Sequence, residues 1–544
     1  MRVMLLGGYG LFGRHLARLL NEQDGLEVLI AGRSLSSAQA LAEQLSNARG
    51  VLCDADANYF PARLRELAPA LLVHLAGPFQ GQDYRVAMAC IEAGVHYIDL
   101  ADGREFVCGI GALDAAARQA GVLVCSGASS VPALSSAAAD HLAKGLASVQ
   151  QIEIGISPGN RTERGLATVR AILGYCGRSL STDDGEALVG WKTTQTHHYP
   201  SPVGARLLSP CDVPDLTLLP LRYSGRPRVR FGAGLELRLL HRGMNLIAAL
   251  RRRGWVRDWS RHARPLNFVA GLLRHLGSDA GAMHVKVNGI TPDGRPQQRT
   301  WQLQALRGDG PFVPTLAAAA LVRALASGQM AQRGALPCVG LLTLNQFERE
   351  AQGRAISMGE PRTLYRQVMG DAFEGLAAAP RHFHNLQGRW KLSGEVRTTP
   401  PASGLGRLLA ALTGTPRSAS TGPIQFELDA APGRERWHRK FPHQAMQSIL
   451  SLGPDGLLTE RLGAARLGFS LGTMPGGGLR MTLQRMQFLG IPCPRWLMPR
   501  VVAEERGEGS RLHFHIRADV PGLGLVAGYD GWLDLENSIE CKPT

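Results

Sequence analysis

Residues 2–34 read RVMLLGGYGLFGRHLARLLNEQDGLEVLIAGRS, and this stretch decides the fold of the first part of the chain. An apolar run, residues 2–6, opens into a glycine-rich loop, and an amphipathic segment and a second apolar run, residues 27–31, follow. Gly8, Gly10 and Gly13 fit the pattern G-x-G-x-x-G. A strand before this pattern and a helix after it are the context that a dinucleotide-binding half requires. We therefore predict a doubly wound parallel sheet of the Rossmann type.

Each glycine of the loop has a separate task in such a site. The first permits a tight turn, the second lets the backbone approach a pyrophosphate, and the third lets the helix pack closely on the strand. The free N–H groups of the helix N-terminus then face the phosphates. We expect the cofactor to contact the whole loop, namely Gly8, Tyr9, Gly10, Leu11, Phe12 and Gly13.

The end of the second predicted strand indicates which dinucleotide is bound. A site that prefers NAD places an acidic residue on the ribose 2′-hydroxyl, roughly 20 residues after the loop. Here the corresponding residues are Gly32, Arg33 and Ser34. An arginine at this position suits a 2′-phosphate, so we predict NADP as the cofactor. The alternative is that Arg33 is a solvated loop residue, because arginine is abundant in this sequence.

Length and charge divide the chain. A chain of 544 residues is too long for one core, and we expect about three domains. Residues 1–150 carry 11 basic and 14 acidic side chains, although the whole chain has a net charge of +15. Residues 222–264 contain twelve arginines among apolar residues and only two acids. This region predicts either peripheral contact with a membrane or an acidic ligand, or simply a solvated basic face.

Other partners and the compartment follow from what the sequence lacks. No zinc knuckle, RNP-like motif or lysine-rich arm is present, so we expect no nucleic-acid partner. The nine cysteines contain no C-x-x-C pair, which favours a reducing, cytoplasmic compartment. No apolar run reaches the roughly 18 residues needed to span a bilayer, and the chain opens on a strand rather than a secretory signal.

The hydrophobic pattern predicts three domains, of α/β, α+β and β-rich class. Strands and helices alternate over residues 1–150, which predicts the parallel sheet and the cofactor domain. Residues 151–350 show short alternating segments and predict an α+β domain that binds substrate or forms a homodimer. Residues 362–540 begin with an amphipathic helix and continue as seven short strands, which predict a curved antiparallel sheet or barrel-like cup of unknown function.

Two further segments carry a family resemblance. Residues 76–79 read AGPF, and residues 93–99 read AGVHYID at the end of the helix that follows. Together with the glycine loop and AGRS, they resemble the saccharopine dehydrogenase-like NADP-binding proteins, over roughly residues 1–350. The segments GRWKLSGEV, RERWHRKF and YDGWLDLE resemble an uncharacterised domain that is often fused behind these proteins.

The resemblance implies further contacts with the cofactor. It places Asp54 near the adenine, and Ala76, Gly77 and Pro78 at the nicotinamide ribose. It also implies an oxidoreductase. Relatives that act on amino acids hold a dicarboxylate with basic and hydroxyl side chains of the second domain, and that set is not recognisable here.

The strand at residues 96–99 supplies candidates for proton transfer. Period-2 alternation puts Tyr97 and Asp99 on one face, where a tyrosine beside a carboxylate could relay a proton. The alternative is that Tyr97 packs in the core and Asp99 caps the next turn. Cys125, Ser126, Ser129 and Ser130 end the following strand and either contact substrate or form a small-residue turn.

The third domain offers weaker signals. His382 with His384, and His513 with His515, have the i, i+2 spacing that would put two imidazoles on one face of a strand. No carboxylate or cysteine accompanies them at ligand spacing, so we expect no metal site. Three tryptophans either line an apolar cavity or form the core, namely Trp390, Trp437 and Trp532.

These observations favour an NADP-dependent oxidoreductase of small molecules whose substrate is unknown and apolar or lipid-like in character. The missing acid–base residue keeps a second hypothesis open, a non-catalytic NADP-binding sensor or scaffold whose third domain binds a ligand. A third hypothesis is an imine reductase of amino acids.

Overall fold

The computed structural model describes residues 1–182, 185, 187–294, 296–431, 433–453 and 455–540. The chain forms two compact units. The first contains residues 1–197 and 205–360, and the second contains residues 198–204 and 361–544.

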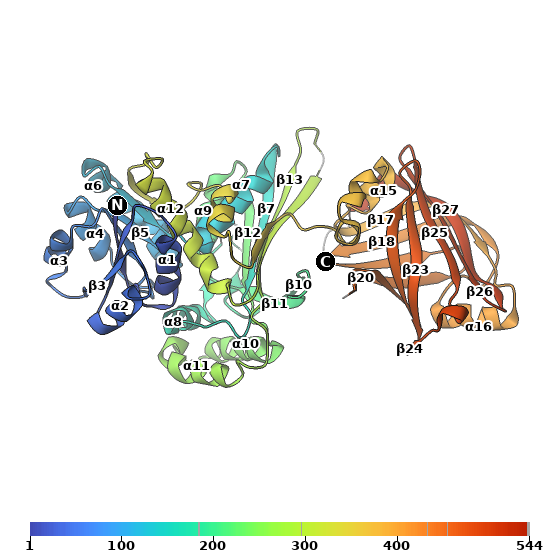
Figure 1. The fold of residues 1–544 in the computed structure, drawn as a ribbon, viewed down its shortest axis with the longest axis horizontal. Helices are drawn as coiled ribbons and strands as arrows, with labels where there is room; N and C mark the ends of the chain where they lie inside the picture. The colour runs from blue at the N-terminus through green and yellow to red at the C-terminus, as the bar shows by residue number, and fades with distance from the viewer. Residues whose placement is uncertain (183–184, 186, 295, 432, 454, 541–544) are drawn as a thin grey trace. The chain divides into compact units, whose positions relative to one another are not determined.

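The first unit begins with the parallel sheet that the sequence predicts, in the order β15-β6-β5-β4-β1-β2-β3 (Figure 1). All its neighbouring strands run parallel. Its strands are β1 (Arg2–Leu6), β2 (Glu27–Gly32), β3 (Ala48–Leu52), β4 (Leu71–His74), β5 (His96–Asp99), β6 (Leu123–Ser126) and β15 (Gly334–Pro337). The connecting helices are α1 (Leu11–Asn21), α2 (Leu35–Ala42), α3 (Phe60–Leu67), α4 (Arg85–Glu92), α5 (Arg104–Gly109) and α6 (Asp114–Gln119).

The sheet is buried on both faces because its strands are apolar at consecutive positions. Val3 and Leu5 of β1 belong to one core cluster, and Met4 and Leu6 belong to another on the opposite face. This is the pattern of a parallel strand covered by helices on both sides. The alternation also fixes which side chains reach the carboxyl edge of the sheet, where the glycine loop lies.

Strand β15 is an addition that our boundary at residue 150 did not include. It pairs with β6, more than 200 positions earlier in the chain, and extends the first sheet after the second domain has been completed. Helix α12 (Leu316–Ala326), which carries the alanine run, precedes it and lies in the core cluster shared by the first and second sheets.

The second domain of this unit is an α+β layer with a mixed sheet, in the order β10-β11-β12-β7-β13-β14-β16. Its strands are β7 (Ser148–Ser157), β10 (Gln195–His198), β11 (Ala205–Pro210), β12 (Arg228–Ala233), β13 (Gly281–Ile290), β14 (Pro296–Ala305) and β16 (Ile356–Gly359). Its helices are α7 (Ser135–Ala143), α8 (Leu166–Tyr175), α9 (Asp215–Arg222), α10 (Arg238–Arg252), α11 (Ala263–Leu272) and α13 (Leu344–Glu350). The short strands β8 (Ser179–Leu180) and β9 (Leu188–Val189) form a separate pair.

The second unit is an antiparallel barrel (Figure 1). Its strands are β17 (Gly388–Thr399), β18 (Ser420–Ala431), β19 (Arg434–Lys440), β20 (Ala445–Leu452), β21 (Leu458–Leu462), β22 (Ala465–Thr473), β23 (Leu479–Phe488), β24 (Ile491–Pro492), β25 (Arg500–Glu508), β26 (Arg511–Val520) and β27 (Gly524–Glu540). Pairing of β22 with β23 closes ten of them into a ring, and β24 pairs only with β23. Its helices are α14 (Leu364–Met369), α15 (Ala378–Phe383) and α16 (Gly404–Thr413).

Closure of the barrel goes beyond the curved sheet or cup that the sequence predicts. All seven predicted strands are present, and β20, β22, β24 and β25 were missed. Inward-facing side chains form one core cluster that alternates with exposed residues along each strand. A closed ring leaves no unpaired edge, which is the general solution for an all-β domain of this kind.

Candidate functional site

The glycine loop has the geometry of a phosphate cradle. Gly7 has a φ of +85°, a backbone conformation that suits glycine, and it turns the chain directly after β1. A Cβ on Gly13 would lie 2.4 Å from the carbonyl oxygen of Gly8, so only glycine lets α1 pack this closely on the loop. Gly10 precedes α1, and no side chain caps the helix N-terminus. The first N–H groups of α1 therefore stay available for an anion.

Tyr9 shapes the neighbouring part of the site. Its ring lies over Gly32, where a Cβ would come 2.4 Å from the tyrosine Cε1. Its hydroxyl accepts a hydrogen bond of 3.0 Å from the backbone N–H of Ser34. The side chain of Ser34 in turn caps α2 by accepting from the N–H of Ser37. Tyr9 thus fixes the turn after β2, the place where the ribose of a dinucleotide is bound.

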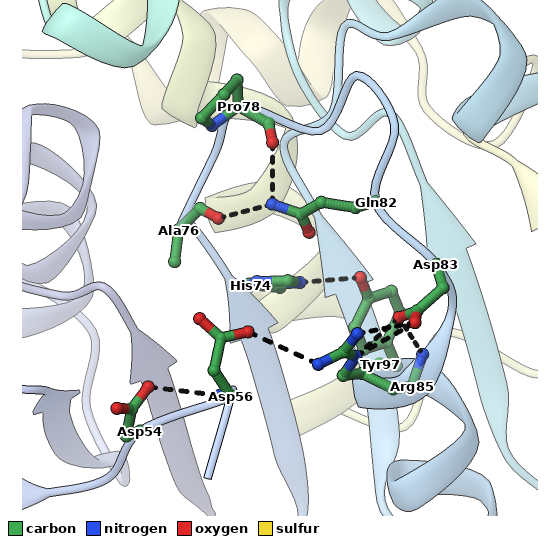
Figure 2. Close-up of polar contacts among 9 residues, drawn as sticks. All are labelled: Asp54, Asp56, His74, Ala76, Pro78, Gln82, Asp83, Arg85 and Tyr97. Atoms are coloured by element: carbon green, nitrogen blue, oxygen red, sulfur yellow. Dashed lines mark hydrogen bonds and ion pairs between the residues drawn. The ribbon is translucent and has the colours of Figure 1, made fainter.

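Arg33 stands exposed on this turn. Among the described residues it makes no hydrogen bond and no ion pair, so its guanidinium is available to a ligand. Asp54 follows β3, and its carboxylate accepts from the N–H of Asp56 at 3.2 Å. Asp56 also lies 3.6 Å from Arg85, whose main partner is Asp83 (Figure 2). Asp54 itself is half-buried, just after β3. Its predicted place near an adenine stays a prediction.

The loop after β4 is held by one amide. Gln82 donates from Nε2 to the carbonyl oxygens of Ala76, at 3.1 Å, and Pro78, at 2.7 Å (Figure 2). A Cβ on Gly7 would lie 3.0 Å from the backbone nitrogen of Ala76, so this loop passes directly beside the glycine loop. The residues predicted to border the nicotinamide ribose are thus brought to the same edge as the pyrophosphate cradle.

Tyr97 and Asp99 have structural partners. Both are fully buried. The hydroxyl of Tyr97 lies 3.1 Å from Nδ1 of His74, whose pKa is lowered to about 4 by burial (Figure 2). Oδ1 of Asp99 accepts from the N–H of Ala101 at 3.0 Å and of Gly127 at 2.8 Å, and from the hydroxyl of Ser126.

Burial raises the pKa of Asp99 to about 6, although these hydrogen bonds lower it. Neither Tyr97 nor Asp99 has surface from which it could touch a substrate in this structure. The geometry favours the structural alternative, in which Tyr97 packs in the core and Asp99 fixes the next turn. Ser126 belongs to that turn as well, Cys125 is buried in the core, and Ser129 is buried while Ser130 is partly exposed.

A carboxylate that the sequence analysis did not single out lies beside the loop after β4. Asp102 follows β5, and its Oδ1 accepts a hydrogen bond of 3.1 Å from Gln80. Burial raises the pKa of this half-buried carboxyl group. The pKa of the Tyr175 phenol, on α8, is raised by burial, by Cys211 and by Asp102. Asp102 therefore lies between the edge of the first sheet and the second domain.

Arg104, two residues after Asp102, joins the turn after β5 to the second domain. Arg104 donates from Nε to the hydroxyl of Thr217 at 2.7 Å, and from Nη1 to the carbonyl oxygen of Ser181 at 2.7 Å and to Asp212 at 3.2 Å. These three partners belong to the second domain. The turn that carries Asp102 is thus fixed from both sides, as a group that must be held in place near a substrate requires.

The predicted histidine pairs do not form metal sites in the described residues. His382 and His384 lie at the end of α15 rather than on a strand, and His384 is buried against Glu505 with Nε2 2.6 Å from Oε2. His513 and His515 lie on β26, where His513 lies 3.2 Å from Glu508.

The described residues contain one group whose ligand atoms lie close enough for a metal ion, Glu153, His197 and His284. The rings of the two histidines stack at 3.6 Å, and Lys286 lies 3.8 Å from Glu153. The imidazole of His284 and the ammonium of Lys286 hold the pKa of Glu153 at about 2. The positive charge of Lys286 therefore already balances the negative charge of Glu153, the only carboxylate of the group.

Trp390, Trp437 and Trp532 of the second unit lie in different surroundings. Trp437 is buried inside the barrel and lines its cavity, with Nε1 donating to Glu435 at 2.8 Å. Trp390 is half-buried and donates to the carbonyl oxygen of Gln387. The ring of Trp532 lies under the guanidinium of Arg511, with Cζ 4.1 Å from the ring centroid. Only Trp437 fits the cavity alternative of the sequence analysis.

Comparisons with known families confirm both predicted resemblances. Residues 3–125 match the model of the saccharopine dehydrogenase NADP binding domain, and residues 376–533 match a domain of unknown function (DUF4166). The first match supports an oxidoreductase that uses a nicotinamide cofactor. It ends at residue 125, so the extension of the resemblance to residue 350 stays a prediction. No curated protein sequence matches the chain.

The chain also aligns with several solved structures at low sequence identity. Saccharopine dehydrogenase (L-Glu forming) from Saccharomyces cerevisiae is 14% identical, with 66% of this chain and 99% of that chain covered and a TM-score of 0.47. Homospermidine synthase from Legionella pneumophila, in complex with NAD, is 12% identical, with 66% and 90% covered and a TM-score of 0.44. Amine dehydrogenase from Mycobacterium smegmatis is 12% identical, with 62% and 94% covered and a TM-score of 0.36.

Proposed function

We propose that the first unit is an NADP-dependent oxidoreductase. The glycine loop and the N-terminus of α1 would hold the pyrophosphate, and Arg33 with Ser34 would hold the 2′-phosphate. The observation that carries the choice of NADP is Arg33 itself, exposed and without a protein partner among the described residues, at the position where NAD sites carry an acid. The bound cofactor supplies the hydride, and the protein must orient it, exclude water and manage a proton.

Replacing Arg33 by Ala tests the cofactor. Loss of a charge-assisted contact should weaken NADPH binding about 10- to 100-fold and leave NADH binding nearly unchanged. Titration calorimetry with both cofactors measures the effect, and Arg65→Ala, an exposed arginine of α3, is the matched control. Equal losses for NADPH and NADH would refute a contact with the 2′-phosphate.

For the proton we propose Asp102. Its support is its place at the carboxyl end of β5, the amide of Gln80 that orients it and the burial that raises its pKa. In the protonated state the carboxyl group can donate to a substrate oxygen or nitrogen. It would act from the turn that Arg104 fixes against the second domain.

The test of Asp102 begins with a substrate search. NADPH oxidation should be followed over a panel of apolar carbonyl, imine and enoyl compounds. With a substrate in hand, Asp102→Asn should lower turnover about 10²- to 10⁴-fold, remove one limb of the pH profile and leave NADPH binding unchanged. A variant with full turnover would overturn the assignment. Protein that binds NADPH but turns over no compound of the panel would favour the sensor or scaffold.

We further propose that this unit works at an anionic membrane surface, where an apolar substrate would be found. The helices α10 and α11 present large exposed apolar side chains, including Leu239, Leu246, Phe268 and Leu272, which are 73%, 60%, 69% and 58% exposed. Between residues 237 and 276 there are nine arginines and only one acid, Asp258. Exposed apolar side chains in an arginine-rich segment are typical of an interfacial helix on anionic lipid.

Vesicle sedimentation tests this surface. The intact protein should pellet with anionic vesicles and much less with zwitterionic ones, and high salt should release it. Phe268→Glu combined with Leu272→Glu should abolish pelleting, whereas Met88→Glu, at an exposed apolar residue of α4, should not. Binding that survives the double substitution would refute the proposal. Among the described residues, no helix is both long and apolar enough to cross a membrane.

A further inference from the structure

The barrel of the second unit encloses a cavity that no part of the proposed oxidoreductase uses. Its volume is about 120 Å³, several times the roughly 10–15 Å³ that one water requires. The side chains that line it come from strands all around the ring and are mostly apolar, for example Phe426, Met446, Leu467, Met481 and Phe514. Empty apolar space costs stability, so side chains of a domain without a ligand tend to collapse into it.

One cation points into this apolar space. Arg439 lies on β19, is only 6% exposed and lines the cavity. Its guanidinium lies over the ring of Trp437, with Cζ 4.8 Å from the ring centroid. Among the described residues its polar contacts are a single hydrogen bond of 3.3 Å to Ser448 and an ion pair of 3.8 Å with Glu460.

A guanidinium has five N–H donors in a planar fork. The contacts of Arg439 therefore leave most of its donors without a hydrogen bond to the described residues, in a place nine-tenths shielded from solvent. Donors that make no hydrogen bond within the protein can bind a ligand, and a carboxylate is the partner whose shape fits the fork. The nearest carboxylate, Glu460, lies beyond hydrogen-bond distance.

The other buried acids of the barrel have their own partners. Glu505 lies 2.6 Å from His384, and Glu435 accepts from Trp437. Burial raises the pKa of Glu435 to about 7, so this group is only partly ionised near neutral pH. Within the part of the chain that the structure describes, Arg439 is thus the one cation on a cavity wall that is mostly apolar, although Thr415, Glu460, Glu504 and Glu505 also line it.

Helix α16 presents exposed apolar side chains on the second unit. It connects β17 to β18, and Thr415, two residues after it, lines the cavity. Leu405 and Leu408 on this helix are 62% and 56% exposed.

We propose that the barrel binds a monocarboxylic acid with an apolar chain, such as a fatty acid, with its carboxylate on Arg439 and its chain among the aromatic and aliphatic side chains of the cavity. The proposal does not depend on the function of the first unit. Both parts of the ligand follow from the site, because the cavity favours an apolar chain and the guanidinium favours an oxyanion.

The experiment uses the full chain and three ligands of one chain length, dodecanoic acid, its methyl ester and dodecane. Calorimetry should report binding of the acid, and so should a change in the tryptophan fluorescence of the protein, to which Trp437 in the cavity wall contributes. The variant Arg439→Gln should weaken binding of the acid about 10- to 100-fold and change binding of the ester far less. Arg480→Gln, which removes an exposed arginine on β23, is the matched control and should bind the acid normally.

A second variant keeps the test independent of Arg439. Ala503 lines the cavity from β25, and Ala503→Phe should fill space and weaken binding of acid and ester alike. Circular dichroism verifies that each variant is folded. The proposal is overturned if the acid does not bind, if Arg439→Gln binds it normally, or if Ala503→Phe leaves binding unchanged.

Discussion

Asp99→Asn is the perturbation that most sharply tests how the first sheet is built. Oδ1 of Asp99 accepts hydrogen bonds from Ala101, Ser126 and Gly127, whereas Oδ2 is buried without a bond of good geometry among the described residues. The hydroxyl of Tyr97 also interacts with the carboxylate and lowers its pKa. An asparagine can keep the three bonds to Oδ1 and place its amide where Oδ2 was. What it removes is the charge.

The magnitude follows from the pKa. Asp99 has a pKa of about 6 in the folded protein, against about 4 in an unfolded chain. Between these values the folded protein holds the proton while the unfolded chain loses it, so stability falls as pH rises through this window. Two pKa units correspond to about 3 kcal/mol, present below pH 4 and lost above pH 6.

The expected result is a difference between two proteins. From pH 4 to pH 7, Asp99→Asn should gain about 3 kcal/mol relative to the wild type. Burying the asparagine NH₂ without an acceptor costs about 1–3 kcal/mol, but this cost is the same at every pH. The pH dependence, rather than stability at one pH, is therefore the diagnostic quantity.

The assay must report the first unit alone, since the two units need not unfold together. Urea unfolding can be followed by mass spectrometry of thiol labelling at Cys90 and Cys125, which are fully buried, after a jump to one common labelling pH.

Asp114→Asn gives a control of opposite sign. Arg118 lowers the pKa of Asp114, so its contribution is present at neutral pH and lost as pH falls. A constant difference between Asp99→Asn and wild type from pH 4 to 7 would refute the reasoning.

Three further predictions concern packing and capping. Gly13→Ala should abolish NADPH binding, measured by calorimetry, because its Cβ would meet backbone oxygen at 2.4 Å, whereas Gly111→Ala meets nothing within 4 Å and should bind normally. Phe347→Ala empties a fully buried site of α13 and should cost about 3–5 kcal/mol in urea unfolding of the first unit. Ser403→Ala removes the N-cap of α16, whose hydroxyl accepts from Gly406, and should cost about 1 kcal/mol in the barrel transition, with Ser403→Gly close to wild type.

The first sheet was predictable because its strands are continuous apolar runs with glycine at the turns. β15 was missed because GALP is four residues long, contains glycine and proline, and gains its place only by pairing with β6. β25 was missed for another reason. Its sequence RVVAEERGE looks like a solvated segment, yet Glu505 points inward and meets His384 from α15, far away in the sequence.

In the candidate site, too, some residues could be predicted from the sequence and others could not. The glycine loop, Arg33 and the loop after β4 were accessible because local sequence patterns determine them. Asp102 was not, since its interest comes from burial and from the amide of Gln80, 22 positions earlier. Alternation predicted the direction of Tyr97 but left open whether its face meets substrate or packs in the core, and burial of Tyr97 favours the core.

Strand β15 has a consequence for synthesis of the chain. Until the ribosome has added residues 334–337, β6 is an open edge of the parallel sheet. Some 208 residues separate the end of β6 from the start of β15, which at about 5–20 residues per second is a delay of roughly 10–40 s. Throughout that time the nascent chain exposes a strand able to pair with other chains. A fragment ending near residue 150 would keep this unpaired strand edge permanently. We therefore expect the cofactor domain to need the second domain even to remain in solution.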